Sequence, residues 1–353
     1  MVYQPSTAIH PGASVQRELN HLGMSQKRLA ERTGLSEKHI SQIVNGEASI
    51  TADTAFLLAN ALGGAASFWL NLDRNYRETL ARLEQEQKAA EEVAELANFP
   101  YNDLVKLGRV EKTTDKVRRV ISLWRFFGVN SFSAIPQTEA VAYRRGYGDG
   151  IKKEALAAWL RCGELDANQL SLAEYDEGQL KLILPKIRQM TQMLDSDFFA
   201  KLQALLADVG VGLVAAQHLA GTQAHGATRW IGDNPIIQLS ARGKDADRVW
   251  FTLFHEIGHI FLHGKKGQFI SFNKSIRSPQ EDEADAFAAK TLISENDYRH
   301  FISQQKISEL DIRHFAQSQG IHTGIVVGRL KKDGIVPYTQ YQNLHAKLQI
   351  KES

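Results

Sequence analysis

The chain of 353 residues contains a single cysteine, Cys162, and this scarcity limits its chemistry. One cysteine forms no disulfide within the chain and cannot build a cysteine-rich metal site. The sequence also lacks an excess of charge of either sign, since 42 Lys and Arg residues oppose 40 Asp and Glu residues for a net charge of +2. Composition by itself therefore predicts no nucleic-acid partner, because a polybasic surface is absent.

Long apolar runs are missing as well. No stretch approaches the roughly 18 apolar residues that a membrane span requires. The first residues, MVYQPSTAIHPGAS, lack the basic start and apolar stretch of a signal peptide. Together with the single cysteine, these absences predict a cytoplasmic, soluble protein with no membrane partner.

What is present is an ordinary globular composition with 43% apolar and 23% charged residues, long enough for two or three domains. Residues 8–77 predict a compact helical domain of short amphipathic helices that start near Ser and end at Gly. Residues 65–97 predict one long helix with a charged second half, and 98–208 predict further helices without obvious site chemistry. Near residue 209 the pattern changes to short aliphatic strands, in VGVGLVAA, HGATRWI and NPIIQLS.

The segment 25–44 predicts two short helices joined by a tight turn at Gly34. Such a pair presents its second helix outward, where it can enter a major groove of DNA. The polar side chains expected on that helix are Ser36, Glu37, Lys38, His39, Ser41 and Gln42, and Gln26 is placed for the DNA backbone. The spacing alone leaves a plain helical bundle as an equal alternative.

A resemblance favours the DNA-binding alternative. The stretch from HPGASVQRELNHLG to FWLNLDRNYR is similar to the Xre-family helix-turn-helix of HigA-type antitoxins over about 70 residues. This resemblance implies a homodimer that binds a palindromic double-stranded DNA operator.

The strongest chemical signal is FHEIGHIFLH at 254–263. His255 and His259 lie four residues apart, so on a helix their imidazoles project from one side and can hold one metal ion. Glu256 lies between them, where it can act as the general base on a water whose pKa the metal lowers toward ~7. The alternative is a chance match inside an amphipathic helix. The apolar flanks of the motif and the presence of a possible third ligand argue against chance.

The third ligand is expected on a helix that begins at Ser278 and Pro279. Glu281 and Asp285 fall on one stripe of this helix with apolar residues, whereas Glu283 points to solvent. We assign Glu281 as the third ligand and Asp285 as the acceptor that orients a ligand histidine. The competing interpretation makes Ser278 and Glu281 a capping box.

The two motifs together resemble thermolysin-like peptidases with two His and one Glu, and residues 209–295 resemble ImmA/IrrE metallopeptidase domains, with a weaker match near 320–330. The resemblance implies an antiparallel sheet behind the metal helix, and a repressor as substrate in some relatives. Zn²⁺ is the default metal for such ligands, and Mn²⁺ or iron can occupy them too.

Four further residues carry weaker signals. His263 is expected to support the site rather than to ligate, and Arg229, Tyr298 and His322 are candidates for stabilising an oxyanion. Cys162 is expected to be buried or inert.

The fold class is therefore mainly α with a small α+β domain. We expect a helix-turn-helix domain over 1–77, a helical linker over 78–120, a helical middle region over 121–208 and a metallopeptidase domain over 209–353. The predicted function is a transcriptional regulator whose endopeptidase domain cleaves a regulatory protein or the chain itself. The alternatives are an antitoxin that neutralises a toxin partner, with a structural or sensing metal domain, and a metal or small-molecule sensor without proteolysis.

Overall fold

The computed structural model describes residues 5–135, 152–194, 197–241, 245–266, 269–272, 278–304 and 306–348. Contacts between Cα atoms divide the chain into two compact units. The first comprises Met1–Ala94 with Thr114–Ile121, and the second Glu95–Thr113 with Ser122–Ser353. Most of the region that we expected to be a separate middle domain groups with the C-terminal part, and the expected boundaries at 77, 120 and 208 stay predictions.

The first unit contains a bundle of short helices followed by one long helix. In chain order they are α1 (Gly12–His21), α2 (Gln26–Thr33), α3 (Glu37–Asn45), α4 (Ala52–Leu62) and α5 (Ala66–Glu91). Their apolar faces meet in one core that includes Leu29, Ile40 and Ile43. The long helix ends at Glu91, earlier than the expected 97, and a 3₁₀ helix (Val93–Asn98) follows.

Side-chain caps explain where α2 and α3 begin. The Ser25 hydroxyl accepts a hydrogen bond from the Arg28 amide, and the Ser36 hydroxyl accepts one from the His39 amide. Both helices end at a glycine, Gly34 and Gly46, in the left-handed conformation that other residues adopt only with strain. The Ser and Gly signals of the sequence thus set the turn between the two helices.

The second unit is built around a small sheet. The described helices that precede the sheet are α6 (Tyr101–Lys106), α7 (Lys116–Phe127), α9 (Lys153–Ala167), α10 (Glu177–Gln189) and α11 (Phe198–Ala207). Of these, α7 spans the division between the two units. The strands are β1 (Gly212–Ala216), β2 (Ala224–Ile231), β3 (Asn234–Ser240) and β4 (Phe269–Phe272). The later helices are α12 (Ala246–His263), α13 (Pro279–Leu292), α14 (Glu295–Ile302), α15 (Glu309–Gln319) and α16 (Thr323–Lys332).

The sheet has the strand order β1-β3-β2-β4. Strands β2 and β3 form a hairpin whose turn contains Gly232 with a positive φ of 61°, and β4 pairs antiparallel with β2. Strand β1 runs parallel to β3. The sheet is therefore mixed: the expected antiparallel pairing holds for β2 with β3 and with β4, and it was wrong for β1 with β3.

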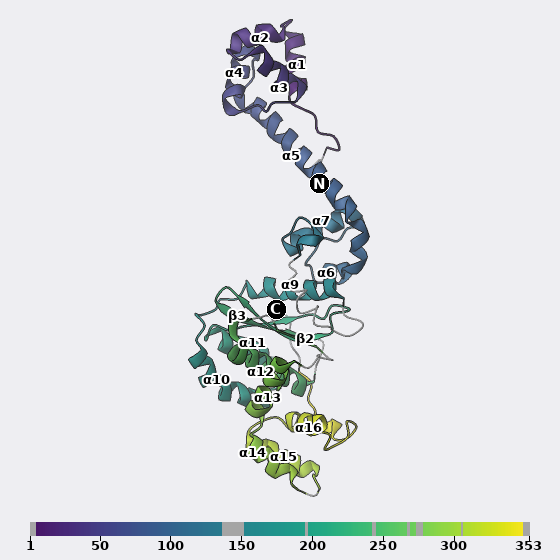
Figure 1. Ribbon diagram of the computed structural model, residues 1–353, viewed down its shortest axis with the longest axis vertical. Helices are drawn as coiled ribbons and strands as arrows, with labels where there is room; N and C mark the ends of the chain where they lie inside the picture. The colour runs from purple at the N-terminus through teal and green to yellow at the C-terminus, as the bar shows by residue number, and fades with distance from the viewer. Residues whose placement is uncertain are drawn as a thin grey trace. The chain divides into compact units, whose positions relative to one another are not determined.

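Helices cover both faces of the sheet. In Figure 1, α9 lies on one side of the sheet, and α11 and α12 lie on the other. Helix α12 is buried along most of its length, because its apolar residues, among them Trp250, Leu253 and Ile257, belong to the main core. None of the described helices is both long and apolar enough to span a membrane. The expected fold class, mainly α with a small sheet in the C-terminal part, is confirmed.

Candidate metal centre

Helix α12 positions two histidines on one side. His255 has 4% of its surface exposed and His259 none, and their Nε2 atoms lie 3.0 Å apart. The spacing of four residues places the rings one turn apart, while the apolar residues of α12 hold the helix against the sheet. Two buried imidazole nitrogens that face each other at this distance need a proton or a cation between them.

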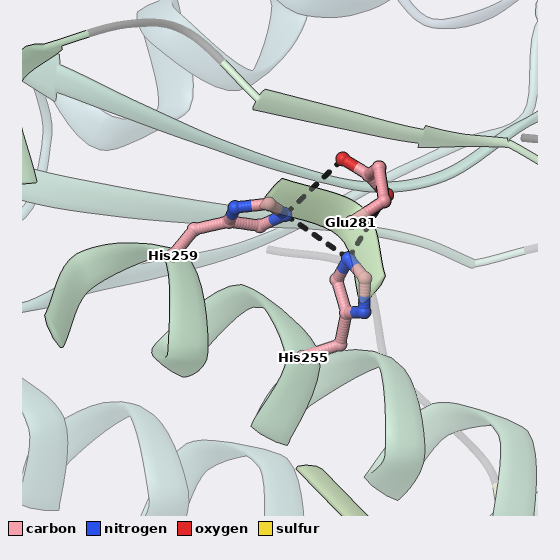
Figure 2. A group of neighbouring side chains, drawn as sticks. All are labelled: His255, His259 and Glu281. Atoms are coloured by element: carbon pink, nitrogen blue, oxygen red, sulfur yellow. Dashed lines mark hydrogen bonds and ion pairs between the residues drawn. The ribbon is translucent and has the colours of Figure 1, made fainter. Parts of the chain in front are cut away.

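Glu281, from the first turn of α13, completes the group shown in Figure 2. Its Oε2 lies 3.2 Å from Nε2 of His255, and its Oε1 lies 3.4 Å from Nε2 of His259. The Ser278 hydroxyl accepts a hydrogen bond from the Glu281 amide, which is one half of a capping box. The Glu281 carboxylate faces the two imidazoles, so Ser278 caps the helix while Glu281 serves the site.

These three side chains fit a divalent metal ion. Their ligand atoms all lie within 4.8 Å of one another, and the closest distances between residues are 3.0, 3.2 and 3.4 Å. Tetrahedral coordination with bonds of about 2.0–2.2 Å requires ligand atoms roughly 3.3–3.6 Å apart. The set of two imidazoles and one carboxylate is thus close to the spacing that Zn²⁺ prefers.

A carboxylate stands behind the first histidine. Nδ1 of His255 lies 2.8 Å from Oδ1 of Asp285, and Oδ2 of Asp285 accepts a hydrogen bond of 2.8 Å from Lys332. With its proton on Nδ1, His255 directs the lone pair of Nε2 toward Glu281 and His259. The Asp285 side chain remains 41% exposed, more than the inward stripe of the sequence suggested.

A second series of hydrogen bonds lies behind His259, and the sequence did not predict its contact with Glu283. Nδ1 of His259 lies 3.0 Å from Nδ1 of His263, and Nε2 of His263 lies 3.1 Å from Oε2 of Glu283. Glu283 is 61% exposed as we expected, yet it contacts His263. When Nδ1 of His259 donates to His263 and Nε2 of His263 donates to Glu283, Nε2 of His259 carries no proton and can bind a metal ion.

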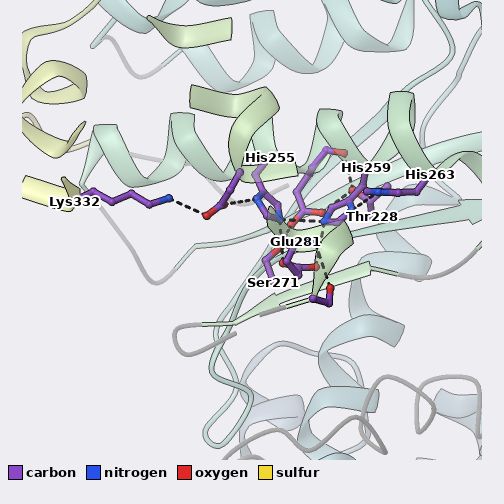
Figure 3. A network of polar contacts seen from close by, with 10 residues as sticks. Thr228, His255, His259, His263, Ser271, Glu281 and Lys332 are labelled. Atoms are coloured by element: carbon purple, nitrogen blue, oxygen red, sulfur yellow. Dashed lines mark hydrogen bonds and ion pairs between the residues drawn. The ribbon is translucent and has the colours of Figure 1, made fainter. Parts of the chain in front are cut away.

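Glu256 is fully buried, and the hydroxyl groups of Thr228 and Ser271, which Figure 3 labels, hold its carboxylate. Thr228 of β2 donates to Oε2 at 2.7 Å, and Ser271 of β4 donates to Oε1 at 2.7 Å. A Cβ atom at Gly226 would collide with this carboxylate, so only glycine fits there. Sequence reasoning missed Thr228 and Ser271, because they lie on strands far along the chain from the motif.

The charges of the site shift its pKa values. Burial lowers the pKa of His255, but hydrogen bonds to Asp285 and Glu281 outweigh this effect and raise it to about 10. Burial raises the pKa of Glu281, whereas hydrogen bonds with His255 and His259 lower it to about 2. Burial also raises the pKa of Asp285, and hydrogen bonds with His255 and Lys332 bring it to about 2. Without metal, a proton on His255 takes the place of the cation.

The stability of the metal-free protein should therefore depend on pH. The raised pKa of His255 gives a stabilising contribution that is complete below about pH 6.5 and is lost as the pH rises toward 10. The lowered pKa values of Glu281 and Asp285 give contributions that are present above about pH 4.5 and are lost as the pH falls toward 2. In thermal denaturation with chelator, the Tm of the wild type should fall toward that of His255→Gln between pH 6.5 and 10. Parallel Tm profiles of the two proteins would contradict this assignment.

The three oxyanion candidates have partners elsewhere. Arg229 donates to the Leu160 carbonyl at 2.7 Å, Tyr298 donates to Asp333 at 2.8 Å, and His322 caps α16 by accepting from the Gly324 amide. Cys162 is buried in α9, and desolvation raises the pKa of its thiol to about 11, which disfavours the reactive thiolate.

In the first unit, the structure places the expected DNA contacts on and around α3. Glu37, Lys38 and Ser36 are exposed, and the Ser36 hydroxyl also caps the helix. His39, Ser41 and Gln42 are half-buried, and Ser41 accepts a hydrogen bond from Asn45. Gln26 at the start of α2 is half-buried and donates to Gln16 at 3.3 Å.

Two family models match the chain, in agreement with these two structural centres. A helix-turn-helix model matches residues 15–69, and the model of the peptidase M78 family, described as the IrrE N-terminal-like domain, matches residues 210–331. The second match contains the metal helix, the sheet and α13, and it ends within α16. The fold and the site thus define a helix-turn-helix protein with a metallopeptidase-like domain.

Curated relatives match the N-terminal part. Virulence-associated protein I of Dichelobacter nodosus is 41% identical over 70 residues, which are 20% of this chain and 65% of the relative. Antitoxin HigA-1 of Vibrio cholerae is 36% identical over 72 residues, which are 20% of this chain and 68% of the relative. The chain thus spans about two thirds of the length of these relatives. A HigA-family antidote protein of Coxiella burnetii, solved as a structure, is 38% identical with a TM-score of 0.23, over 24% of this chain and 94% of that one.

The chain belongs, through its N-terminal helix-turn-helix, to the family of the HigA antitoxins, and it carries a C-terminal IrrE-like domain.

Proposed function

We propose that the chain is an operator-binding transcriptional regulator whose C-terminal domain is a metal-dependent endopeptidase. The observation that carries the enzymatic part is the convergence of His255, His259 and Glu281 beside the buried carboxylate of Glu256. The substrate is a regulatory protein or the chain itself, and its cleavage would change the expression of the regulated genes.

In this proposal each residue has a defined task. His255, His259 and Glu281 would hold Zn²⁺, or Mn²⁺ in its place, while Asp285 and His263 fix the orientation of the rings. When bound there, the metal ion would supply Lewis acidity toward the scissile carbonyl and the attacking water. Glu256 accepts the proton of that water and delivers it to the nitrogen of the leaving amine. Thr228 and Ser271 fix the Glu256 carboxylate in place through the hydrogen bonds that they donate to it.

The role of Ser271 as a positioning residue can be tested by removing its hydroxyl. Ser271→Ala is expected to lower kcat for peptide cleavage about tenfold and leave KM unchanged, because it loosens Glu256 without touching the substrate. Ser271→Thr keeps a hydroxyl group and should restore most of the rate. An equal loss in both variants would show that packing at β4, and not the hydrogen bond, is responsible.

The DNA-binding part of the proposal rests on α2 and α3 and on the similarity to HigA antitoxins. Helix α3 is the element that enters the major groove, where Gln42 and Ser41 read base edges and Lys38 contacts phosphate. Recognition of a palindromic operator implies a homodimer. Since the net charge is only +2, affinity depends on dimerisation and base contacts more than on nonspecific attraction.

Two substitutions on α3 separate these contacts. On DNA from upstream of its own gene, Gln42→Ala should weaken binding by roughly 5- to 150-fold and relax the preference for one base. Lys38→Ala should weaken binding to all DNA sequences alike. It should also reduce the slope of log affinity against log salt concentration by about 1. Lys88→Ala, in the last turn of α5, is the control and should change neither. Unchanged operator affinity in both α3 variants would remove α3 from the interface.

A second candidate function follows from the similarity to antitoxin HigA-1. In this alternative the chain neutralises a toxin encoded by a neighbouring gene and represses its own operon, and the metal domain is structural or sensing. Co-expression of the neighbouring gene with the wild type and with Glu256→Gln distinguishes the two. Equal rescue of growth favours the antitoxin, whereas rescue by the wild type alone favours the peptidase.

A further inference from the structure

A cavity of about 530 Å³ lies beside the metal centre. Its wall is formed by the first half of α12, the end of α13, α16 and the C-terminal segment up to Lys347. The volume is within the range of about 300–1,000 Å³ that small-molecule sites occupy. None of the three metal-ligand candidates contributes to the wall, so the cavity is a separate site.

The wall of this cavity carries more positive than negative side chains. It contains the carboxylates of Asp245 and Asp247, of which Asp245 pairs with Arg248 at 3.8 Å. The cations of the wall are Arg248, Arg329, Lys331, Lys332 and Lys347. Arg329 and Lys332 form ion pairs with Asp333 and Asp285, which lie outside the wall.

Lys331 is the most unusual of these cations, because only 5% of its surface is exposed. Its Nζ donates a hydrogen bond of 2.8 Å to Nε2 of His345, whose Nδ1 lies 3.2 Å from Oδ1 of Asp247. Among the residues that the structure describes, no other acceptor contacts this ammonium group, which has three N–H donors. A buried cation without a carboxylate in direct contact favours an anionic ligand.

The pKa of Lys331 agrees with this picture. Desolvation lowers it, and the attraction of Asp247 only partly opposes that effect. The charged form is therefore incompletely compensated by the protein itself.

The same wall also contains apolar side chains. Leu292 and Ile293 at the end of α13, Ile325 of α16 and the Phe251 ring of α12 line it. A cavity lined by both cationic and apolar side chains matches a ligand that has an anionic group and an apolar body.

We propose that this cavity binds a small molecule with an anionic carboxylate or phosphate head and an apolar body. The head lies at Lys331 and Lys347, and the body lies against Ile325 and Leu292. The ligand is a small molecule, because the cavity has its size and is lined by side chains of one compact unit.

Lys332 connects the cavity to the metal centre, and Figure 3 shows its side chain extending toward His255. It lines the cavity and also donates to Asp285, which contacts His255. An anion that attracts Lys332 leaves the Asp285 carboxylate more available to His255, and this strengthens the imidazole as a ligand. Binding in the cavity is therefore expected to raise the metal affinity several-fold, and metal binding to raise the affinity for the anion by the same factor.

Calorimetric titration of the full chain with phenyl phosphate and with benzoate tests the site. We use metal-free protein and His259→Ala, so that neither probe can bind through a metal ion. At least one probe should bind saturably, and at least tenfold more tightly than phenol or inorganic phosphate, which each lack one half. The tighter of the two probes identifies the head group.

Matched variants locate this binding. Lys331→Met, which fills the same buried space, and Lys347→Gln, on the exposed rim, should each weaken the better probe, the former at least tenfold. Lys181→Met on α10 is the control and should change nothing. Absence of saturable binding, or unchanged affinity in both cavity variants, would overturn the proposal.

The link is measured as the metal affinity with and without benzoate, by competition with a chromophoric chelator. Benzoate should raise the metal affinity of the wild type several-fold, and it should leave the metal affinity of Lys332→Met unchanged. An identical metal affinity in the presence of bound benzoate would refute the link. Because the binding test needs no metal, its failure is distinguishable from a failure of the proposed peptidase.

Discussion

Glu256→Gln is expected to abolish proteolysis while the protein keeps its metal. Glutamine has the size of glutamate, and one hydroxyl of Thr228 or Ser271 can turn to accept from the new amide, so the site should keep its shape. The amide accepts no proton from water, and loss of a general base costs about 10²- to 10⁴-fold in rate. The measurement is the initial rate of cleavage, with metal content determined on the same samples.

The matched control for this variant is Asp282→Asn, which changes an exposed acid in the first turn of α13. It should retain the wild-type rate. If Glu256→Gln cleaved at the rate of this control, the general base would lie elsewhere or the cleavage would come from a contaminant.

The second large effect concerns the metal itself. His259→Ala removes one of the three ligands, so metal affinity should fall well beyond the roughly 10- to 100-fold that loss of an outer partner costs. Asp285→Asn should show that smaller loss, because it only weakens the orientation of His255. Competition with a chromophoric chelator gives both constants.

His314→Ala, an exposed histidine on α15, controls for adventitious binding to imidazoles. It should bind metal as the wild type does. An affinity of His259→Ala within a few-fold of the wild type would place the metal outside the group of His255, His259 and Glu281.

The parts of the site that sequence could predict are those within a single helix. The spacing of four residues between His255 and His259 and the stripe of Glu281 and Asp285 follow from helical geometry alone. Helical geometry does not show which helices pack together. The two histidines on one segment and the two inward acids on the other nevertheless indicated that these helices pair. The structure indeed places Glu281 against both histidines and Asp285 against His255.

The parts that sequence missed depend on contacts between distant elements. Thr228 and Ser271 reach Glu256 only because β2 and β4 pair above α12, and β4 is a strand of four residues without a clear alternating pattern. Glu283 reaches His263 although helical periodicity turned it toward solvent, because a long side chain at the edge of α13 extends back toward α12.

The fold was predictable to a similar degree. The strands β1, β2 and β3 were expected from their short aliphatic stretches. The direction of β1 relative to β3 was not, since a parallel and an antiparallel edge strand have the same apolar character. In the first unit, Ser caps and Gly ends gave both helix boundaries and the turn between α2 and α3.

Mass spectrometry of intact proteins determines whether the metal centre cleaves a regulatory protein or the chain itself. The purified chain is incubated with the products of its neighbouring genes, in the presence of Zn²⁺, with chelator, and with Mn²⁺ or Zn²⁺ added back after the chelator. We expect defined fragments of the chain or of one neighbouring gene product with metal and none with chelator. The fragments should return when metal is added back, and Glu256→Gln should produce none. The same fragments in chelator or with Glu256→Gln, or no fragments under any of these conditions, would contradict this expectation.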